Sequence, residues 1–298
     1  MSRQTSVGEA PTTLVCETFE VSRSSVYAAR RAAKEPKPEP SARQAARRGA
    51  VTAPTLVAAV QAIIAAQPAW GHRKVWAVLR HPRDGSEPMR VSRRRVYEVM
   101  RANGWTLPSS TRDVVTTRGH VVVPDPNRRI AADLTTVWTR KDGMVAVVLT
   151  VDCGCRSVLD VTATKSQSSP AVLGSVERGL LEAFGEPANV GDGAELRTDH
   201  GPQFTGADAA ALASRWGLQQ TFAPVGRPTG NAVAERTIQT MKAECLWLEE
   251  FEDVDDVQRA LDRWHYTFNH ERPHQALGWK TPAEVRAEKL GQPEREAA

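Results

Sequence analysis

The feature that most constrains the fold is a change in apolar periodicity near residue 126. Before it, apolar residues recur at helical spacing. After it, three successive β-rich segments predict strands at 130–138, 144–152 and 157–164. A Lys-Asp-Gly turn at 141–143 joins the first two, so we expect an antiparallel meander. Helical and strand patterns then alternate to about residue 250, which predicts a mixed α/β sheet flanked by helices.

The second half of this α/β region supplies further predicted elements. Ser169-Pro170 predicts the start of a helix whose apolar face includes Val176 and Leu180. The remaining predictions are a strand at Glu195–Thr198, a helix at Ala207–Trp216, a strand at Leu218–Ala223 and a long helix from Asn231 past Leu248. The last helix carries an apolar stripe of Ala234, Ile238, Met241, Cys245 and Leu248.

The region before residue 126 predicts two small helix-turn-helix units. Residues 1–33 form a short fragment whose second helix is basic and includes Arg23, and residues 53–108 form three helices. Ser92 caps the third of these, which places Arg93, Arg94 and Arg95 in its first turn, where a recognition helix contacts DNA. The alternative is a solvated basic helix. The pattern Val-Ser-Arg-x-x-Val-Tyr occurs at 21–27 and again at 91–97, and this repeat favours DNA binding.

Composition shifts give the domain boundaries. Segments 34–52 and 109–125 are predicted linkers, residues 126–250 the α/β core, and residues 251–298 a C-terminal helical tail. Residues 1–120 carry 20 Lys and Arg against 9 Asp and Glu, whereas residues 121–298 carry 19 against 26. A basic front and an acidic back indicate a nucleic-acid-binding module joined to one that holds cations. Two unrelated surface compositions are the alternative.

The compartment is predicted from what the sequence lacks. No apolar run approaches the roughly 18 residues of a membrane span, and the N-terminus has no signal-peptide pattern. We therefore expect a cytoplasmic, nucleoid-associated protein without a membrane partner. The cysteines Cys16, Cys153, Cys155 and Cys245 show no paired metal spacing, which predicts reduced structural thiols.

Three carboxylates are the candidate site. Asp133 lies in an otherwise apolar or small-residue strand, where a carboxylate costs free energy unless it is paired or metal-bound. Asp199 follows a short strand, and Glu235 lies on the last helix after a gap of thirty-five residues. Lys242 falls at i+7 from Glu235, on the same helical face. Converging carboxylates are what Mg²⁺ or Mn²⁺ requires, and such ions serve phosphoryl transfer.

Other interpretations of these residues remain open at this level. An isolated acid on a strand or helix is usually a surface or capping residue, and Asp152 and Asp160 lie in the same predicted meander. Composition therefore cannot single out Asp133. Zinc would need histidines at ligand spacing, which His200, His265, His270 and His274 do not offer.

Three stretches of this region carry a family resemblance. The segments ADLTTVW around Asp133, TDHGPQFTG around Asp199 and NAVAERTIQTMKAECLW around Glu235 resemble the catalytic core of the DDE transposases of bacterial insertion sequences. These enzymes are related to retroviral integrases and have a ribonuclease-H-like fold. The tail from Tyr266 and the helical unit Gly71–Leu107 are similar to the same family, so the resemblance covers roughly residues 10–285.

The resemblance implies a mechanism and its components. Asp133, Asp199 and Glu235 would bind two Mg²⁺ or Mn²⁺ ions for strand cleavage and strand transfer at the ends of an insertion sequence. Gln203, Asn231 and Lys242 would contact DNA near the site. The implied partners are double-stranded DNA of the terminal repeats and target, and a homodimer or higher assembly on DNA. Family members are often the second of two overlapping reading frames, so the upstream-frame protein is a further partner.

Two other function classes compete with a transposase. A plain metal-dependent nuclease would share the acids but would not need two DNA-binding units or the family's tail. A non-catalytic DNA-binding protein would keep the arginine-rich helices, and its three carboxylates would be free to change. The sequence retains all three.

Overall fold

The computed structural model describes residues 53–108, 122–223 and 231–291. The predicted first helix-turn-helix fragment with Arg23 and the first linker therefore lie outside the described residues. So does most of the second linker.

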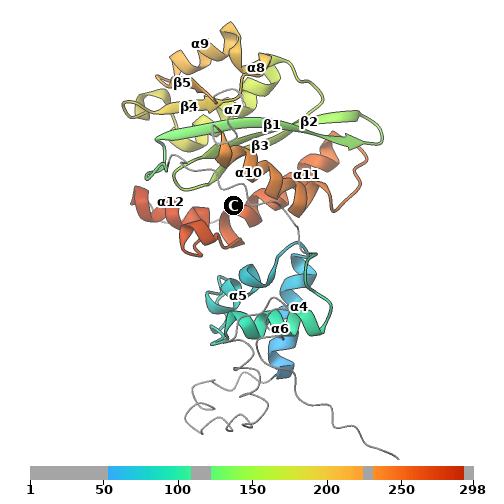
Figure 1. Ribbon diagram of the computed structural model, residues 1–298. Helices are drawn as coiled ribbons and strands as arrows, with labels where there is room; N and C mark the ends of the chain where they lie inside the picture. Colours follow the sequence, from blue (N-terminus) through green and yellow to red (C-terminus); the bar gives the residue numbers. More distant parts are fainter. Residues whose placement is uncertain (1–52, 109–121, 224–230, 292–298) are drawn as a thin grey trace, which may run out of the picture. The chain divides into compact units, whose positions relative to one another are not determined.

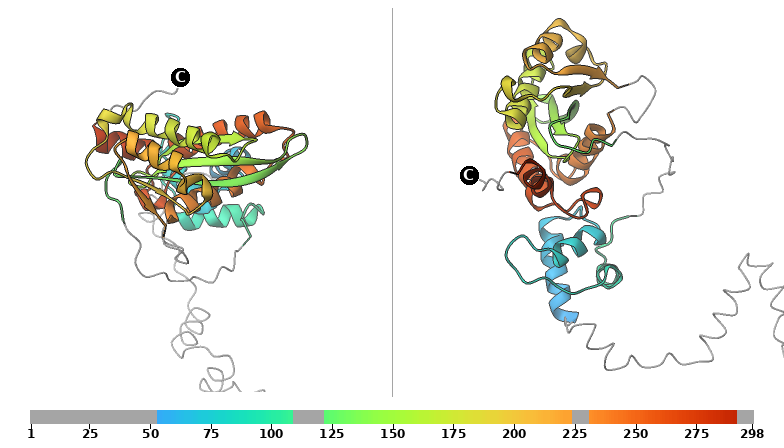
Figure 2. Two further views of the ribbon diagram at one scale, coloured as in Figure 1. Left: turned by 90° about the horizontal axis from the view of Figure 1, so that it is seen from above. Right: turned by 90° about the vertical axis from the view of Figure 1, so that its left-hand side faces the viewer.

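A five-stranded mixed sheet forms the centre of the α/β region (Figures 1 and 2). Its strands are β1 (Arg129–Thr139), β2 (Gly143–Asp152), β3 (Val158–Thr164), β4 (Glu195–Thr198) and β5 (Gln219–Phe222), in the spatial order β3-β2-β1-β4-β5. The first three are antiparallel neighbours, while β4 and β5 run parallel to β1. The predicted meander, both later strands and the fold class are confirmed.

The β1–β2 turn shows how local chemistry starts the sheet. Gly143 has φ +69°, a conformation that glycine adopts without the steric penalty of a side chain. The Thr139 hydroxyl donates to the Gly143 carbonyl and accepts from the Asp142 amide, which closes the turn. The register Trp138↔Met144 follows from this closure.

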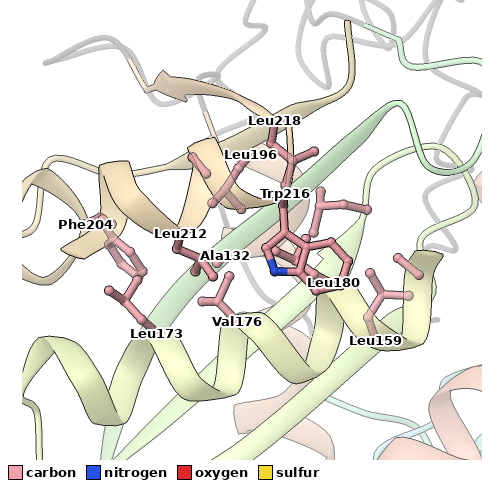
Figure 3. Close-up of a cluster of buried hydrophobic side chains, with 14 of the residues drawn as sticks. Ala132, Leu159, Leu173, Val176, Leu180, Leu196, Phe204, Leu212, Trp216 and Leu218 are labelled. Atoms are coloured by element: carbon pink, nitrogen blue, oxygen red, sulfur yellow. The ribbon is translucent and has the colours of Figure 1, made fainter. Parts of the chain in front are cut away.

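Helices cover both faces of the sheet. On one face pack α7 (Ser169–Phe184) and α9 (Ala207–Arg215), with the short α8 (Pro202–Thr205) between them in sequence. Figure 3 shows Trp216 beside Leu180 in this layer. At Gly179, α7 approaches β2 so closely that a Cβ atom would stand 2.6 Å from the Thr150 side chain. The predicted face of α7 is buried as expected.

The opposite face is covered by α10 (Ala232–Met241), the π-helix η2 (Lys242–Leu246) and α11 (Val254–Tyr266). Sheet residues such as Ala131 and Leu149 share one apolar cluster with Leu261 and Trp264 of α11. The beginning of the predicted tail is therefore part of the core that supports the sheet. The elements η1 (Pro187–Asn189), η3 (Thr267–Glu271), η4 (Gln275–Leu277) and α12 (Pro282–Leu290) complete the described α/β region.

The predicted long helix past Leu248 is wrong at its C-terminal end. α10 ends at Met241, and five residues of π-helix follow, in which the Trp247 amide donates to the Lys242 carbonyl at 2.9 Å. A π-turn has more residues per turn than an α-turn, so it rotates the later side chains around the axis. Leu246 is consequently buried, whereas Leu248 is 50% exposed.

The preceding helical domain has the three predicted helices, α4 (Ala53–Ala66), α5 (His72–Arg80) and α6 (Arg93–Ala102). Leu56, Val75 and Met100 are fully buried at their contact, as the apolar spacing predicts. The Ser92 hydroxyl accepts from the Arg95 amide, so the predicted cap of α6 is confirmed. Within the described ranges, no helix is both long and apolar enough to cross a membrane.

Candidate active site

Two of the candidate acids lie at the same level of neighbouring parallel strands, Asp133 within β1 and Asp199 directly after β4. β1 and β4 pair through Ala131↔Arg197, and Asp133 and Asp199 each lie two residues farther along. Because side chains alternate along a strand, Asp133 faces the same side as Ala131, which packs in the α10–α11 layer. Asp133 is half-buried and Asp199 is exposed at the end of its strand.

The third acid comes from the first turn of α10. Asn231 precedes this helix, and its buried side-chain amide donates to the Ala132 carbonyl of β1 at 3.2 Å. The Glu235 amide in turn donates to the Asn231 carbonyl at 3.0 Å. The start of α10 is therefore tied to the strand residue next to Asp133. An acid in the first turn is also favoured by the helix dipole.

The charges of this region act on one another. Burial, with smaller contributions from the negative charges of Asp199 and Glu235, raises the pKa of Asp133 to about 6, although the Leu134 amide and Lys242 act in the opposite direction. Burial also raises the pKa of Glu235. Asp199, Glu235 and Lys242 therefore all lie within electrostatic range of Asp133.

Ion pairing separates these acids from the other carboxylates of the sheet. Asp152 is fully buried and pairs with Arg286 at 3.1 Å, and Asp160 pairs with Arg178 at 3.2 Å. Asp133, by contrast, accepts a hydrogen bond from the Leu134 amide at 2.8 Å and has no ion-pair partner among the described residues. Asp199 and Glu235 likewise have no ion-pair partner among the described residues. The structure thus distinguishes Asp133 from Asp152 and Asp160, which composition could not do.

The donor set suits a hard divalent cation, although the carboxylates do not form a closed coordination shell. Oxygen ligands and surplus negative charge are what Mg²⁺ and Mn²⁺ prefer. Within the part of the chain that the structure describes, no three His, Cys, Asp or Glu side chains stand close enough to hold an ion together. The fit therefore rests on the chemistry and charge of Asp133, Asp199 and Glu235.

Gln203 lies beside Asp199. A Cβ atom on Gly201 would stand 3.0 Å from both the Asp199 Oδ1 atom and the Gln203 Oε1 atom, so the two side chains flank this glycine. The Gly201 amide donates to Asp199 Oδ1 at 2.9 Å. The backbone amide of Gly201 therefore orients the Asp199 carboxylate. Because glycine has no side chain, it also leaves space for this carboxylate. The sequence analysis did not single out Gly201.

The predicted DNA contacts of α6 differ in their surroundings. Arg93, Arg94 and Arg95 are all exposed. The Arg93 guanidinium lies over the Trp76 ring at 4.3 Å, while Arg94 pairs with Glu98 at 2.8 Å. Arg93 is thus held by an aromatic ring of its own domain.

Two of the histidines considered for zinc have roles inside the fold. The His265 Nε2 atom lies 2.7 Å from the Val158 carbonyl oxygen. His274 is buried, and burial together with Arg272 lowers its pKa to about 2.

Residues that the sequence did not single out form a buried charge cluster that joins η2, α5 and the segment after η3. The Glu244 carboxylate receives two hydrogen bonds from Arg272, at 2.8 and 3.0 Å, and one from Lys74 of α5 at 2.5 Å. The sequence signal that could have indicated this cluster was Glu244 itself, an acid two residues after Lys242 on the same helical segment. Asn231 was expected to contact DNA, but its contact in the structure is with Ala132.

Comparison with protein-family models assigns both regions. Residues 54–112 match the HTH-like domain, and residues 123–228 and 216–282 match two models described as integrase core domain. Curated relatives include a transposase for insertion sequence element IS986/IS6110 from Mycobacterium tuberculosis, 29% identical over 77% of this chain and 85% of the relative. The transposase InsD for insertion element IS2 from Escherichia coli is 26% identical over 74% of this chain and 75% of its own length.

Among solved structures, a chain of the simian T-cell lymphotropic virus intasome in complex with PP2A regulatory subunit B56 gamma is similar. It has a TM-score of 0.46 and 15% identity over 80% of this chain and 78% of that chain. The HTLV-2 integrase catalytic core domain in complex with magnesium has a TM-score of 0.39 and 16% identity. It covers 54% of this chain and 97% of its own.

The helix-turn-helix-like domain and the following mixed sheet thus define a polynucleotidyl transferase with an integrase core. Within that class, the chain belongs to the transposases of bacterial insertion sequences.

Proposed function

We propose that this transposase cleaves a DNA strand at the end of its element and joins the freed 3′-hydroxyl to target DNA at Asp133, Asp199 and Glu235. The observation that carries the proposal is the approach of these acids from β1, β4 and α10 without an ion-pair partner among the described residues. Burial and the charges of Asp199 and Glu235 raise the pKa of Asp133, and such an arrangement becomes favourable when a cation shares the three carboxylates.

Two Mg²⁺ or Mn²⁺ ions, when bound, would activate the attacking hydroxyl and stabilise the leaving oxygen at phosphorus. Asp133 and Asp199 would hold them from the sheet, and Glu235 from the start of α10. Because Asn231 ties that helix start to the Ala132 carbonyl, it would position Glu235 relative to Asp133. The burial of Asn231 supports this inward role of its side chain.

Lys242 and Gln203 would orient the DNA. The positive charge of Lys242 acts on Asp133, so Lys242 would receive a phosphate adjoining the reacting one. Gln203 stands beside Asp199 and offers an amide to a sugar or phosphate oxygen. Arg94 and Arg95 on α6, with Arg93 anchored on Trp76, would bind the terminal repeat as double-stranded DNA.

Assembly on DNA follows from the reaction. Two element ends must be cut and joined together, so at least two copies of the chain would act on one complex, alone or with the upstream-frame protein. The part before residue 53, with Arg23, would add a second contact to DNA.

The test is strand transfer with labelled element-end DNA and Mg²⁺, run with wild type and with Asp133→Asn, Asp199→Asn and Glu235→Gln. Joined product from wild type alone supports the proposal. A nick without joining in wild type would replace it with a nuclease. If wild type neither nicks nor joins DNA that it binds, a DNA-binding regulator becomes the better description.

A further inference from the structure

A basic cavity opens between the start of α5 and α10. Its volume is about 520 Å³, and its walls come from the beginning of α5, the loop before β3, the outer face of α10 and the segment after η3. The ionisable side chains that line it are all basic: His72, Arg73, Lys74, Arg156, Arg236, Arg272 and His274. No Asp or Glu is among its described lining residues.

Only part of this charge is neutralised by the protein. Glu244, behind the wall, pairs with Lys74 and Arg272. Arg73, Arg156 and Arg236 have no ion-pair partner among the described residues, and Arg236 donates to the Gln239 side chain at 3.3 Å. A cluster of cations at a partly enclosed surface is unfavourable unless an anion joins it.

The titration of the lining groups agrees with a positive potential. Burial lowers the pKa of Lys74, and the nearby Arg272 lowers it further, although Glu244 acts in the opposite direction. Burial also lowers the pKa of His72, with Arg73 and Arg93 adding to the effect. The neighbouring positive charges thus favour the neutral forms of Lys74 and His72. This effect is expected at a site whose positive potential would bind a polyanion.

The position of the cavity selects the anion. Arg236 follows Glu235 directly in α10, and Arg73 comes from the helix-turn-helix-like domain. A DNA backbone carries one phosphate per nucleotide, so DNA that contacts both α5 and α10 would present phosphates to this cavity. A volume of about 520 Å³ accommodates a sugar-phosphate unit, since small-ligand sites range from roughly 300 to 1,000 Å³.

We propose that this cavity is a DNA-backbone site, in which Arg73, Arg156 and Arg236 hold a phosphodiester of the bound element end. The site rests on the proposed function because it needs DNA at the acids. It would fix the strand between the helix-turn-helix-like domain and α10, so that binding of the element end and placement of the reacting phosphate are coupled.

The experiment measures the affinity of the full chain for a fluorescent double-stranded oligonucleotide at increasing salt. The pocket variant is Arg156→Gln with Arg236→Gln. The control is Arg215→Gln with Arg259→Gln, which removes the same charge from two exposed arginines on α9 and α11. We expect the pocket variant to bind roughly tenfold more weakly and to lose about two units of the slope of log affinity against log salt. The control should keep the wild-type slope.

Arg73→Gln is a second variant on another wall, and it should lower the slope by about one. Each variant must keep the wild-type thermal unfolding midpoint. Slopes and affinities equal to those of the control would overturn the proposal. So would a DNA affinity equal to that of wild type, combined with loss of stabilisation by inorganic phosphate, because the site would then take a free anion.

Asp199→Asn separates this proposal from the catalytic one. It should bind DNA with the wild-type slope while joining no strands. If wild type itself joined no strands but the pocket variants still lost slope, the backbone site would stand and the catalytic proposal would fail.

Discussion

Two groups of carboxylates in the same domain differ in whether basic side chains pair with them. Asp152 and Glu244 are buried and surrounded by donors: Asp152 by Arg286 and backbone amides, Glu244 by Arg272 and Lys74. Asp133 and Asp199 have backbone amides as their donors and no ion-pair partner among the described residues. The first group holds elements together, whereas the second keeps negative charge available at a cost to stability.

The pKa shifts express the same contrast. Burial alone would raise the pKa of Glu244, but Arg272 and Lys74 outweigh it and the pKa is lowered. At Asp133, burial and the neighbouring acids leave the pKa raised. A paired carboxylate therefore stabilises the fold when ionised, and an unpaired one destabilises it. Carboxylates whose pKa is perturbed by burial and by neighbouring charges are common at functional sites.

The largest effect is expected from exchanging charge for an amide in each group. Asp199→Asn should lower strand transfer on the order of 10³-fold and leave the free energy of unfolding within about 0.5 kcal/mol, because the amide oxygen can still accept from Gly201. Asp152→Asn should instead cost about 3–5 kcal/mol of stability, since Arg286 loses its partner. Strand-transfer assays and urea unfolding of both proteins test this. Equal loss of stability would abolish the contrast.

Glu244→Gln should lower the free energy of unfolding by about 3 kcal/mol, because it leaves Lys74 and Arg272 without a buried counter-charge. A matched surface change, Glu249→Gln, breaks an exposed pair with Arg263 and should cost less than about 1 kcal/mol. Urea unfolding compares the two. Similar values would mean that the Glu244 cluster is solvated and does not join α5 to the tail.

Gly201→Ala tests placement without any change of charge. The new Cβ atom would stand 3.0 Å from Asp199 and from Gln203, so one side chain must move. We expect strand transfer to fall by roughly 10- to 100-fold through misplacement of the carboxylate. Alanine at Gly206, where the nearest atom to a new Cβ would be at 3.7 Å, is the control. Wild-type turnover in Gly201→Ala would show that the Asp199 position is not critical.

The smallest effect concerns pH. In metal-free protein the raised pKa of Asp133 makes the folded state take up a proton before the unfolded state does. The stability of wild type relative to Asp133→Asn should therefore rise by about 2 kcal/mol as the pH falls from 7 through about 6 towards 4. Added Mg²⁺ should reduce this dependence. A pH-independent difference in the unfolding free energy would contradict the raised pKa.

Much of the fold was predictable because it follows from the local periodicity of apolar residues. The three meander strands follow from period-2 segments and a Lys-Asp-Gly turn, and α7 follows from its apolar face. The end of α10 was not predictable, because the π-helix that follows it depends on tertiary packing and the apolar spacing of the sequence is compatible with a continuous α-helix. As a result, Leu246 is buried in the core, where the predicted α-helix would have placed Leu248.

The candidate site divides in the same way. The sequence determined that Asp133, Asp199, Glu235 and Lys242 are present at their spacings, and the parallel pairing of β1 with β4 brings the first two to one level. Only the tertiary structure decided that Asp133, and not Asp152 or Asp160, lacks an ion-pair partner among the described residues. It also turned Asn231 inward to Ala132 and gathered basic groups from α5, α10 and the tail around one cavity. The physical reason is that pairing and burial depend on residues far apart in the chain, which periodicity does not record.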